Sequence, residues 1–245
     1  MGSARSMIRK FWGVGSLLLF LAACNPRLSS GLRKKDLKKD VEISTSKGII
    51  VIRLSDSTPL HRDNFLRLAK SGYYDSLLFH RVIRHFMIQS GDPNSKNGNP
   101  GKPLSQGGSE GPGYTIPAEF RPTLFHKRGA LGAARTGDDV NPTRASSGSQ
   151  WYIVQGRRFT DAGLDSVEKF RLKGRKIPED ERFVYRQLGG APHLDQQYTV
   201  FGEVVRGMDV VDSIAAVETS GPPLDRPVAH ANVRILKMRL IRRTN

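Results

Sequence analysis

The sequence of 245 residues contains a single cysteine, Cys24. One thiol cannot form an internal disulfide, so the fold depends on packing. The six histidines show no metal-ligand spacing, and no serine lies in a nucleophile-elbow motif. Gly101-Lys102 is followed by Pro103 instead of the Ser or Thr of a phosphate-binding loop. The sequence therefore indicates neither a metal or other cofactor nor nucleophilic catalysis.

Acidic residues are scarce relative to basic ones. The chain has 39 Lys and Arg against 23 Asp and Glu, a net charge of +16, of which +13 remains after the three cations that precede Cys24. This charge favours anionic surfaces, and a basic protein that binds anionic polymers is one interpretation. Because no nucleic-acid-binding motif is present, we expect no specific nucleic acid partner. A hydrophobic content of 38% with 25% charged residues is typical of a globular protein.

The N-terminus resembles a bacterial lipoprotein signal. Residues 7–10 carry two cations, and the next 13 residues, 11–23, carry no charge, which is too short a run for a membrane-spanning helix. Leu21-Ala22-Ala23-Cys24 then matches the lipobox, in which cleavage precedes an acylated cysteine. We expect a signal peptide at 1–23, a lipid on Cys24, a flexible basic tether at 24–40 and a location at the bacterial cell envelope, facing the periplasm. An ordinary signal peptide with a chance cysteine is the alternative.

The rest of the chain, 41–245, is predicted to form one mainly β domain. Apolar alternation over 41–54 with Ser46-Lys47-Gly48 in the middle predicts a hairpin. Thr58-Pro59 predicts a helix start, and an apolar stripe continues to Gly72. A second helix is expected over 207–217 and a final strand over 228–240.

Residues 79–92, FHRVIRHFMIQSGD, predict two short strands joined by a bend. Period-2 alternation places Arg81 with Ile83, and Met87 with Gln89. The stretch resembles the central motif of the cyclophilin family of peptidyl-prolyl cis–trans isomerases. Two further blocks resemble that family in the same order: residues 147–154, SGSQWYIV, and residues 192–204, PHLDQQYTVFGEV. The resemblance covers about residues 41–240, minus an insertion described below.

The chain departs from the family pattern at several places. His193 stands where eukaryotic members commonly have Trp, and Tyr198 where they commonly have His. Arg135 differs from the commonest residue of a small-residue stretch, 128–135, which is expected to let a substrate backbone lie close. An insertion occupies about 157–190. Its mixed charges and one short helix at 178–190 predict a solvated projection.

The resemblance implies a closed eight-stranded antiparallel barrel capped by two α-helices, acting as a monomer on proline-containing polypeptides. Rotation about an X–Pro bond needs no nucleophile, since its barrier of about 18–20 kcal/mol arises from amide resonance. A guanidinium directed at the proline nitrogen or the flanking carbonyl would stabilise the twisted state. Arg81 is the expected catalytic residue, oriented by a hydrogen bond from Gln89. The expected substrate-binding residues are Phe86, Met87, Ala134, Arg135, Gln150, Tyr152, His193, Leu194 and Tyr198.

The function implied is a peptidyl-prolyl isomerase that assists the folding of exported proteins. A non-catalytic chaperone or scaffold that binds proline peptides at the cell envelope remains the alternative, because a binding groove can persist without catalysis.

Overall fold

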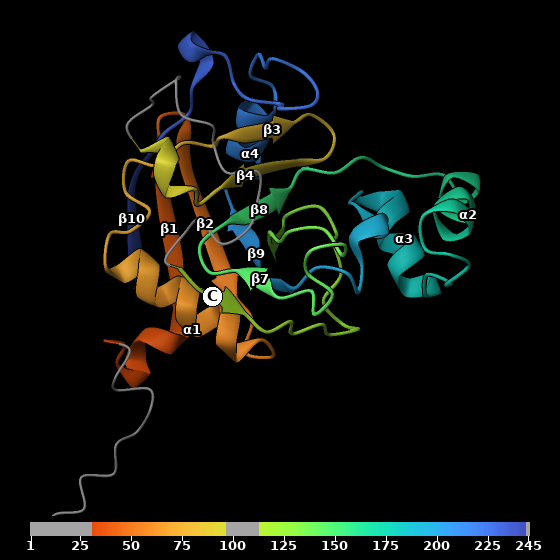
Figure 1. Ribbon diagram of the computed structural model, residues 1–245, viewed down its shortest axis with the longest axis horizontal. Coiled ribbons are helices and arrows are strands. Elements are labelled where there is room, and N and C mark those ends of the chain that lie inside the picture. The colour runs from red at the N-terminus through yellow and green to blue at the C-terminus, as the bar shows by residue number, and fades with distance from the viewer. Residues whose placement is uncertain (1–30, 97–112, 244–245) are drawn as a thin grey trace, which may run out of the picture.

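The computed structural model describes residues 31–96 and 113–243. Its main sheet contains eight antiparallel strands in the order β10-β1-β2-β9-β6-β8-β4-β3 (Figure 1). The strands are β1 (Lys39–Thr45), β2 (Gly48–Leu54), β3 (Arg81–Ile83), β4 (Met87–Ser90), β6 (Ala130–Ala133), β8 (Trp151–Val154), β9 (Val200–Arg206) and β10 (Ile235–Arg242). A second, small sheet pairs β5 (Thr115–Ile116) with β7 (Ser146–Ser147).

The first hairpin confirms the alternation in the sequence. Val41 lies opposite Ile52, and Ile43 lies opposite Ile50. All four side chains are fully buried in the main hydrophobic core. Because successive side chains of a strand point to opposite faces, these residues line one face of the sheet and fix its register against the core.

The sheet is curled and open. Its two outer strands, β3 and β10, form no strand pair with each other within the described residues. The segment that leads into β3 partly bridges this gap, since the backbone N–H of Phe79 donates to Val233 and the N–H of Ile235 donates to Leu77. A β3 of only three residues is too short to continue that ladder. The prediction of eight antiparallel strands is confirmed, whereas closure of the barrel is not.

Two helices pack on the main core, as expected. Helix α1 (Pro59–Lys70) buries Phe65 and Leu68, and helix α4 (Met208–Ala215) buries Val211 and Ile214. Thr58 occupies the N-cap position of α1, but its side chain makes no capping bond. The side chain of Glu119, distant in sequence, instead accepts hydrogen bonds from the backbone N–H groups at the start of α1.

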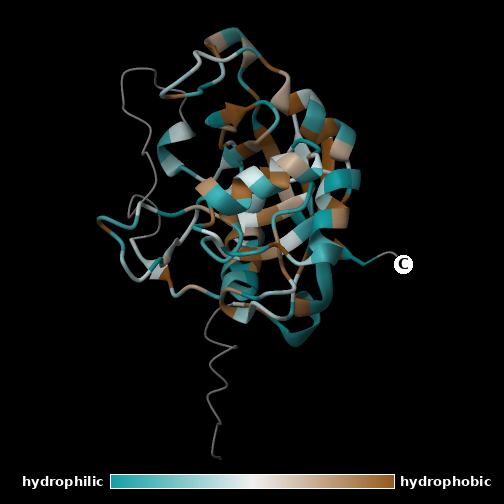
Figure 2. Ribbon diagram, turned by 90° about the vertical axis from the view of Figure 1, so that its right-hand side faces the viewer, coloured by the Kyte–Doolittle hydropathy of each residue, from teal (hydrophilic) through white to brown (hydrophobic). Residues whose placement is uncertain are grey.

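The insertion is more structured than its charge pattern predicts. It holds two helices, α2 (Asp161–Phe170) and α3 (Glu179–Gln187), to one side of the sheet (Figure 1). Its ribbons carry both hydrophobic and hydrophilic residues in Figure 2, where this side faces the viewer. Inside, the insertion has a small hydrophobic core of its own, formed by Leu164, Leu172, Ile177 and Tyr185. The predicted helix near 178–190 is confirmed as α3, and α2 was not predicted.

The insertion begins and ends at one point. Arg157 forms an isolated antiparallel bridge with Gly190, and the backbone N–H of Gly190 donates to the carbonyl of Arg157. A side chain on Gly156 would lie 2.6 Å from the backbone of Gly190, so the close approach requires glycine there.

The prediction of a flexible tether is wrong for residues 32–40. Leu32 is buried in the main core, and the short 3₁₀ helix Lys34–Lys38 buries Asp36. The carboxylate of Asp36 lies 2.9 Å from Lys70 Nζ and 3.4 Å from Lys39 Nζ. The buried carboxylate of Asp36 therefore pairs with a cation of the basic run, Lys39, and with a cation of α1, Lys70. Cys24 and the predicted signal peptide lie outside the described residues.

Within the described residues, no helix is both long and apolar enough to cross a membrane.

Candidate functional site

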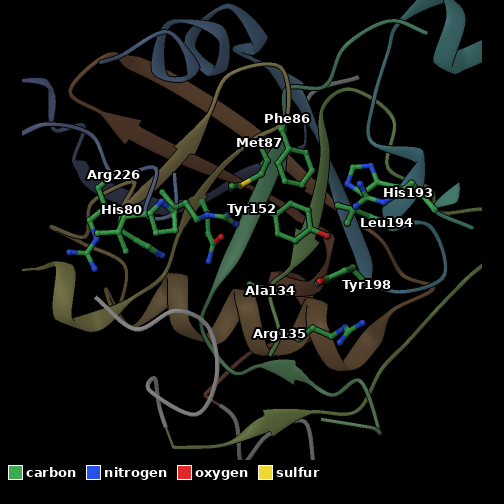
Figure 3. Close-up of a pocket in the computed structure, with 15 residues that line it drawn as sticks. His80, Phe86, Met87, Ala134, Arg135, Tyr152, His193, Leu194, Tyr198 and Arg226 are labelled. Carbon is green, nitrogen blue, oxygen red and sulfur yellow. The ribbon is translucent and has the colours of Figure 1, made fainter. Parts of the chain in front are cut away.

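A pocket of ≈ 460 Å³ opens on the outer wall of the sheet, and we call it the wall pocket. It is lined by His80, Arg81, Phe86, Met87, Gln89, Ala134, Arg135, Tyr152, Arg171, His193, Leu194, Tyr198, Pro223, Leu224 and Arg226 (Figure 3). The structure thus brings every predicted catalytic and substrate-binding residue to this pocket except Gln150, although they come from segments more than 100 residues apart.

Strand pairing places the polar and apolar residues of the central stretch side by side. Arg81 lies opposite Gln89, and Ile83 lies opposite Met87. Directly opposed residues of an antiparallel pair share a face, so one sheet face presents a cation, an amide and apolar groups together. This is the arrangement that the alternation predicted.

The floor of the wall pocket is a hydrophobic cluster separate from the main core. Met87, Tyr152 and Leu194 are buried in it, and Phe86 packs against it half-buried. Figure 3 shows the Phe86 and Tyr152 rings beside the thioether of Met87. A side chain on Gly132 would lie 2.3 Å from the Tyr152 ring, so one member of the small-residue stretch makes room for the floor rather than for a substrate backbone.

Arg81 stands at the rim and is only loosely held. Its side chain is 40% exposed, and its guanidinium Nη2 lies 3.5 Å from Asp225 Oδ2. The expected hydrogen bond from Gln89 to Arg81 is not formed: the Gln89 side-chain amide instead donates to Gln150 Oε1 at 3.0 Å. Gln150 is buried behind the pocket and supports Gln89 from there.

Two histidines that border the pocket are neutral at neutral pH. Burial, reinforced by the nearby Arg226 and Arg81 cations, lowers the pKa of His80 to about 4. Burial and the Arg171 cation lower the pKa of His193 to about 4 as well. Desolvation disfavours the protonated form of histidine in both places, so the histidines add polarity but no charge near neutral pH.

The side chain of Arg135 fixes another wall of the pocket. Its guanidinium lies 4.5 Å from the centre of the Tyr198 ring, a cation–π contact. Nε donates to the carbonyl of Gln197, and Nη1 lies 2.7 Å from Asp138. These contacts hold the Arg135 side chain in place, so that Arg135 lines the pocket and also positions Tyr198.

Comparison with known proteins agrees with this geometry. A family model described as cyclophilin type peptidyl-prolyl cis-trans isomerase/CLD matches residues 40–240. A candidate peptidyl-prolyl cis–trans isomerase of Staphylococcus saprophyticus is 33% identical over 204 residues, which are 83% of this chain and 92% of that protein. The chain belongs to the cyclophilin family. Its enzyme class is that of the family, isomerisation of the peptide bond that precedes proline.

Other relatives of this cyclophilin differ in length or in sequence. A candidate bifunctional phosphatase/peptidyl-prolyl cis–trans isomerase of Streptococcus pyogenes is 37% identical over 190 residues, 76% of this chain, and the chain spans only 36% of that protein. A cyclophilin of Cryptosporidium parvum is 22% identical and shares the fold, with a TM-score of 0.58 over 84% of this chain and 98% of that one. A second structure of the Cryptosporidium protein, in the presence of the dipeptide Ala-Pro, gives a TM-score of 0.57.

A buried chain of hydrogen bonds joins the floor of the cyclophilin pocket to the insertion. Tyr185 of α3 donates to Asp195 Oδ2 at 2.6 Å, and Asp195 Oδ1 lies 2.9 Å from His126 Nδ1. His126 Nε2 in turn lies 2.9 Å from the hydroxyl of Tyr152. Burial raises the pKa of the Tyr152 and Tyr185 hydroxyls, so both stay protonated. The insertion therefore supports the floor as well as standing beside it.

Sequence reasoning missed one side of the cyclophilin pocket. Pro223, Leu224 and Arg226 come from an irregular loop that has no periodic pattern. The loop is fixed there by a backbone bond from Val82 N–H to the carbonyl of Asp225. Arg171, at the end of α2, was missed because the insertion has no counterpart in the family motifs.

Proposed function

We propose that this cyclophilin catalyses rotation about X–Pro bonds in exported proteins, with Arg81 as the catalytic residue. The observation that carries the proposal is the position of Arg81. Its guanidinium stands at the rim of an apolar floor formed by Phe86, Met87, Tyr152 and Leu194, which suits a proline ring.

The chemistry follows from how the amide changes during rotation. As the X–Pro bond twists, resonance is lost and the proline nitrogen becomes pyramidal and basic. A guanidinium donor near that nitrogen, or near the flanking carbonyl, interacts more strongly with the twisted state than with either planar isomer. Arg81 suits this role because guanidinium keeps its charge beside apolar groups and its long contact to Asp225 leaves donors free.

The other pocket residues bind the peptide in its ground state. The floor takes the proline ring, and Gln89, held by Gln150, offers a fixed amide to the peptide backbone. His193 and Tyr198 border the floor of the wall pocket (Figure 3). The Ala-Pro dipeptide present with the Cryptosporidium relative supports a proline ligand. Because one chain supplies all of these residues, we propose that it acts as a monomer.

The proposal includes a place in the cell. Leu21-Ala22-Ala23-Cys24 supports lipid attachment at Cys24, and the basic residues 33–39 suit an anionic membrane surface. We propose a lipid-anchored protein of the bacterial envelope that faces the periplasm. Cys24→Ala should move the protein from the membrane to the soluble fraction and abolish the lipid mass at the mature N-terminus. If the Cys24→Ala protein stayed in the membrane fraction with an unchanged mass at its mature N-terminus, lipid attachment at Cys24 would be refuted.

The decisive experiment for activity is catalysed isomerisation of a short proline tetrapeptide, followed by a conformer-selective protease or by NMR exchange. We expect turnover that is proportional to protein concentration. Binding of the tetrapeptide without any acceleration would instead establish the chaperone or scaffold alternative.

A further inference from the structure

A second groove, of ≈ 590 Å³, adjoins the wall pocket on the side of the insertion. We call it the insertion groove. It is lined by His85, Phe86, Arg157, Phe159, Gly163, Ser166, Val167, Phe170, Arg171, Gly190 and His193. Three of these, Phe86, Arg171 and His193, also line the wall pocket. The rings of Phe86 and His193, both labelled in Figure 3, have centres 5.3 Å apart. Because they line both cavities, we call this pair the ridge.

Helix α2 supplies the outer wall of this groove with one face. Gly163, Ser166, Val167 and Phe170 recur at intervals of three or four residues, the spacing of a single helical face. The helix buries a different face, with Leu164 in the small core of the insertion. Phe170 is 72% exposed, and its ring contacts the ammonium of Lys169 at 5.1 Å. Val167 on the same face packs against the small core of the insertion, which leaves Phe170 as the exposed apolar side chain of this face.

The charge of the groove is positive. No lining residue is acidic, whereas Arg157 and Arg171 both line it. Neither guanidinium lies within 4.0 Å of a carboxylate among the described residues; Arg157 stands over the Phe159 ring at 5.0 Å. The acidic residues of α2 are directed elsewhere, since Asp161 and Asp165 pair with Arg182 of α3. The groove therefore offers two cations and exposed aromatic surface to one ligand.

We propose that the insertion groove binds the client segment flanking the isomerised proline and prefers an aromatic residue next to an acidic one. This inference rests on the proposed function, because the occupant is the same polypeptide whose proline sits in the wall pocket. Shared lining residues give continuity with the wall pocket, and the two cations give the charge preference.

The test compares proline peptides on the full chain, with calorimetric affinity and catalysed turnover measured separately. The core peptide is Ala-Ala-Pro-Ala. Two extended peptides add Asp-Phe-Gly before it or Gly-Phe-Asp after it, and matched controls replace Phe and Asp with Ser and Lys. One Phe/Asp peptide should bind about tenfold more tightly than the core, as expected when one aromatic side chain is partly buried beside a surface ion pair. Its Ser/Lys control should not.

Matched variants locate the effect. Phe170→Ala and Arg157→Ala should each remove most of the preference, measured as the ratio of the two affinities. Phe183→Ala, on the exposed side of α3, and Arg158→Ala, beside Arg157, should leave the ratio unchanged, because neither lines the groove. Equal affinity for core and extended peptides, or equal effects of Phe170→Ala and Phe183→Ala, would overturn the proposal.

Separate readouts distinguish this proposal from the activity itself. If the protein accelerates isomerisation of the core peptide but shows no affinity preference among the peptides, the proposal for the insertion groove is refuted and the isomerase activity stands. A preference that depends on Phe170 in a protein that accelerates neither peptide would support the groove and refute the isomerase. A concentration-dependent dimer that Phe170→Ala dissociates would mean that a second copy fills the groove, and would overturn the proposal.

Discussion

The strand wall and the insertion contribute to the site by different physical means. On the wall, β3, β4 and β8 set Arg81, Gln89 and Tyr152 by backbone pairing, so their positions follow from strand register. The insertion depends on a small core and on ion pairs such as Arg182 with Glu168. We infer that the wall carries the chemistry, which needs fixed geometry, and that the insertion carries recognition, which can vary. The predictions below test that division.

Arg81→Ala should have the largest effect. Loss of one transition-state donor typically lowers the rate by about 10²–10³. Arg81→Lys should recover only part of it, because an ammonium lacks the planar fork of donors. Arg84→Ala is the matched control, since Arg84 is exposed on the same bend and does not line the wall pocket. If a folded Arg81→Ala protein turned over substrate at the wild-type rate, Arg81 would not be the catalytic residue.

His80 should make the stability of the wall depend on pH. Its pKa is about 4 in the folded protein, against the ordinary histidine value of 6.5. Folding therefore favours neutral His80, which contributes stability above pH 6.5 that is lost as the pH falls towards 4. The loss should reach up to about 3 kcal/mol, from about 1.36 kcal/mol per pKa unit. Urea unfolding of His80→Asn should show a shallower acid slope than wild type; parallel slopes would contradict the prediction.

Tyr185→Phe should test the link between the two regions. It removes the hydroxyl that donates to buried Asp195 and leaves a carboxylate with fewer donors. The free energy of unfolding should fall by about 1–3 kcal/mol, the usual range for an unmet buried partner. Chemical denaturation measures the loss, with Phe183→Ala as a control on the same helix. If stability is unchanged, the insertion stands beside the wall without supporting it.

Asp225→Asn should have a smaller effect on turnover, of about threefold to tenfold, the size expected for weakening one charged contact. Asp225 acts as a positioning residue for Arg81 through the 3.5 Å ion pair, so kcat should fall more than KM rises. Asp225→Glu should restore part of the rate. The turnover rate of Gln89→Ala, a variant that loses the hydrogen bond to Gln150, should lie between the rates of the wild type and of Arg81→Ala. An effect of Asp225→Asn on KM alone would argue against positioning.

His193→Trp should have the smallest effect. A larger ring on the ridge beside Phe86 adds apolar cover for a proline peptide, and we expect about twofold to threefold tighter binding. Peptide titration of the two forms measures this change. Identical affinities would show that the ridge separates the two grooves without contacting the ligand.

Regular elements were predictable from the sequence, and contacts between distant segments were not. The hairpin over 41–54 follows from alternation, and so does the grouping of Arg81 with Ile83 and of Met87 with Gln89. The register that sets Arg81 opposite Gln89 depends also on the length of the bend between the strands. Asp225 could not be placed, because only a tertiary backbone bond to Val82 brings it there. The bond between Gln89 and Arg81 was mispredicted, since sharing a face does not decide which neighbour an amide selects.

The missed helix α2 did leave a signal. Thr160 caps it, its hydroxyl accepting from the N–H of Gly163, and Asp161 occupies the first turn. Gly163 within the helix lowers its propensity, so tertiary packing of Leu164 decides the outcome. Residues 32–40 were misread for a related reason: their abundant charge hid Asp36, whose burial depends on Lys70 of another element.

Because the bridge between Arg157 and Gly190 holds the two ends of the insertion together, the insertion can be replaced as one continuous segment. When a segment whose two ends already meet becomes longer, the entropic free-energy cost of closing it rises only slowly, by about 0.6 kcal/mol for each doubling of its length. New segments could therefore be grafted at this point without shifting β8, provided that each supplies a hydroxyl to Asp195 in place of Tyr185. The same catalytic wall could thus be retargeted to different clients by changing one continuous stretch of chain.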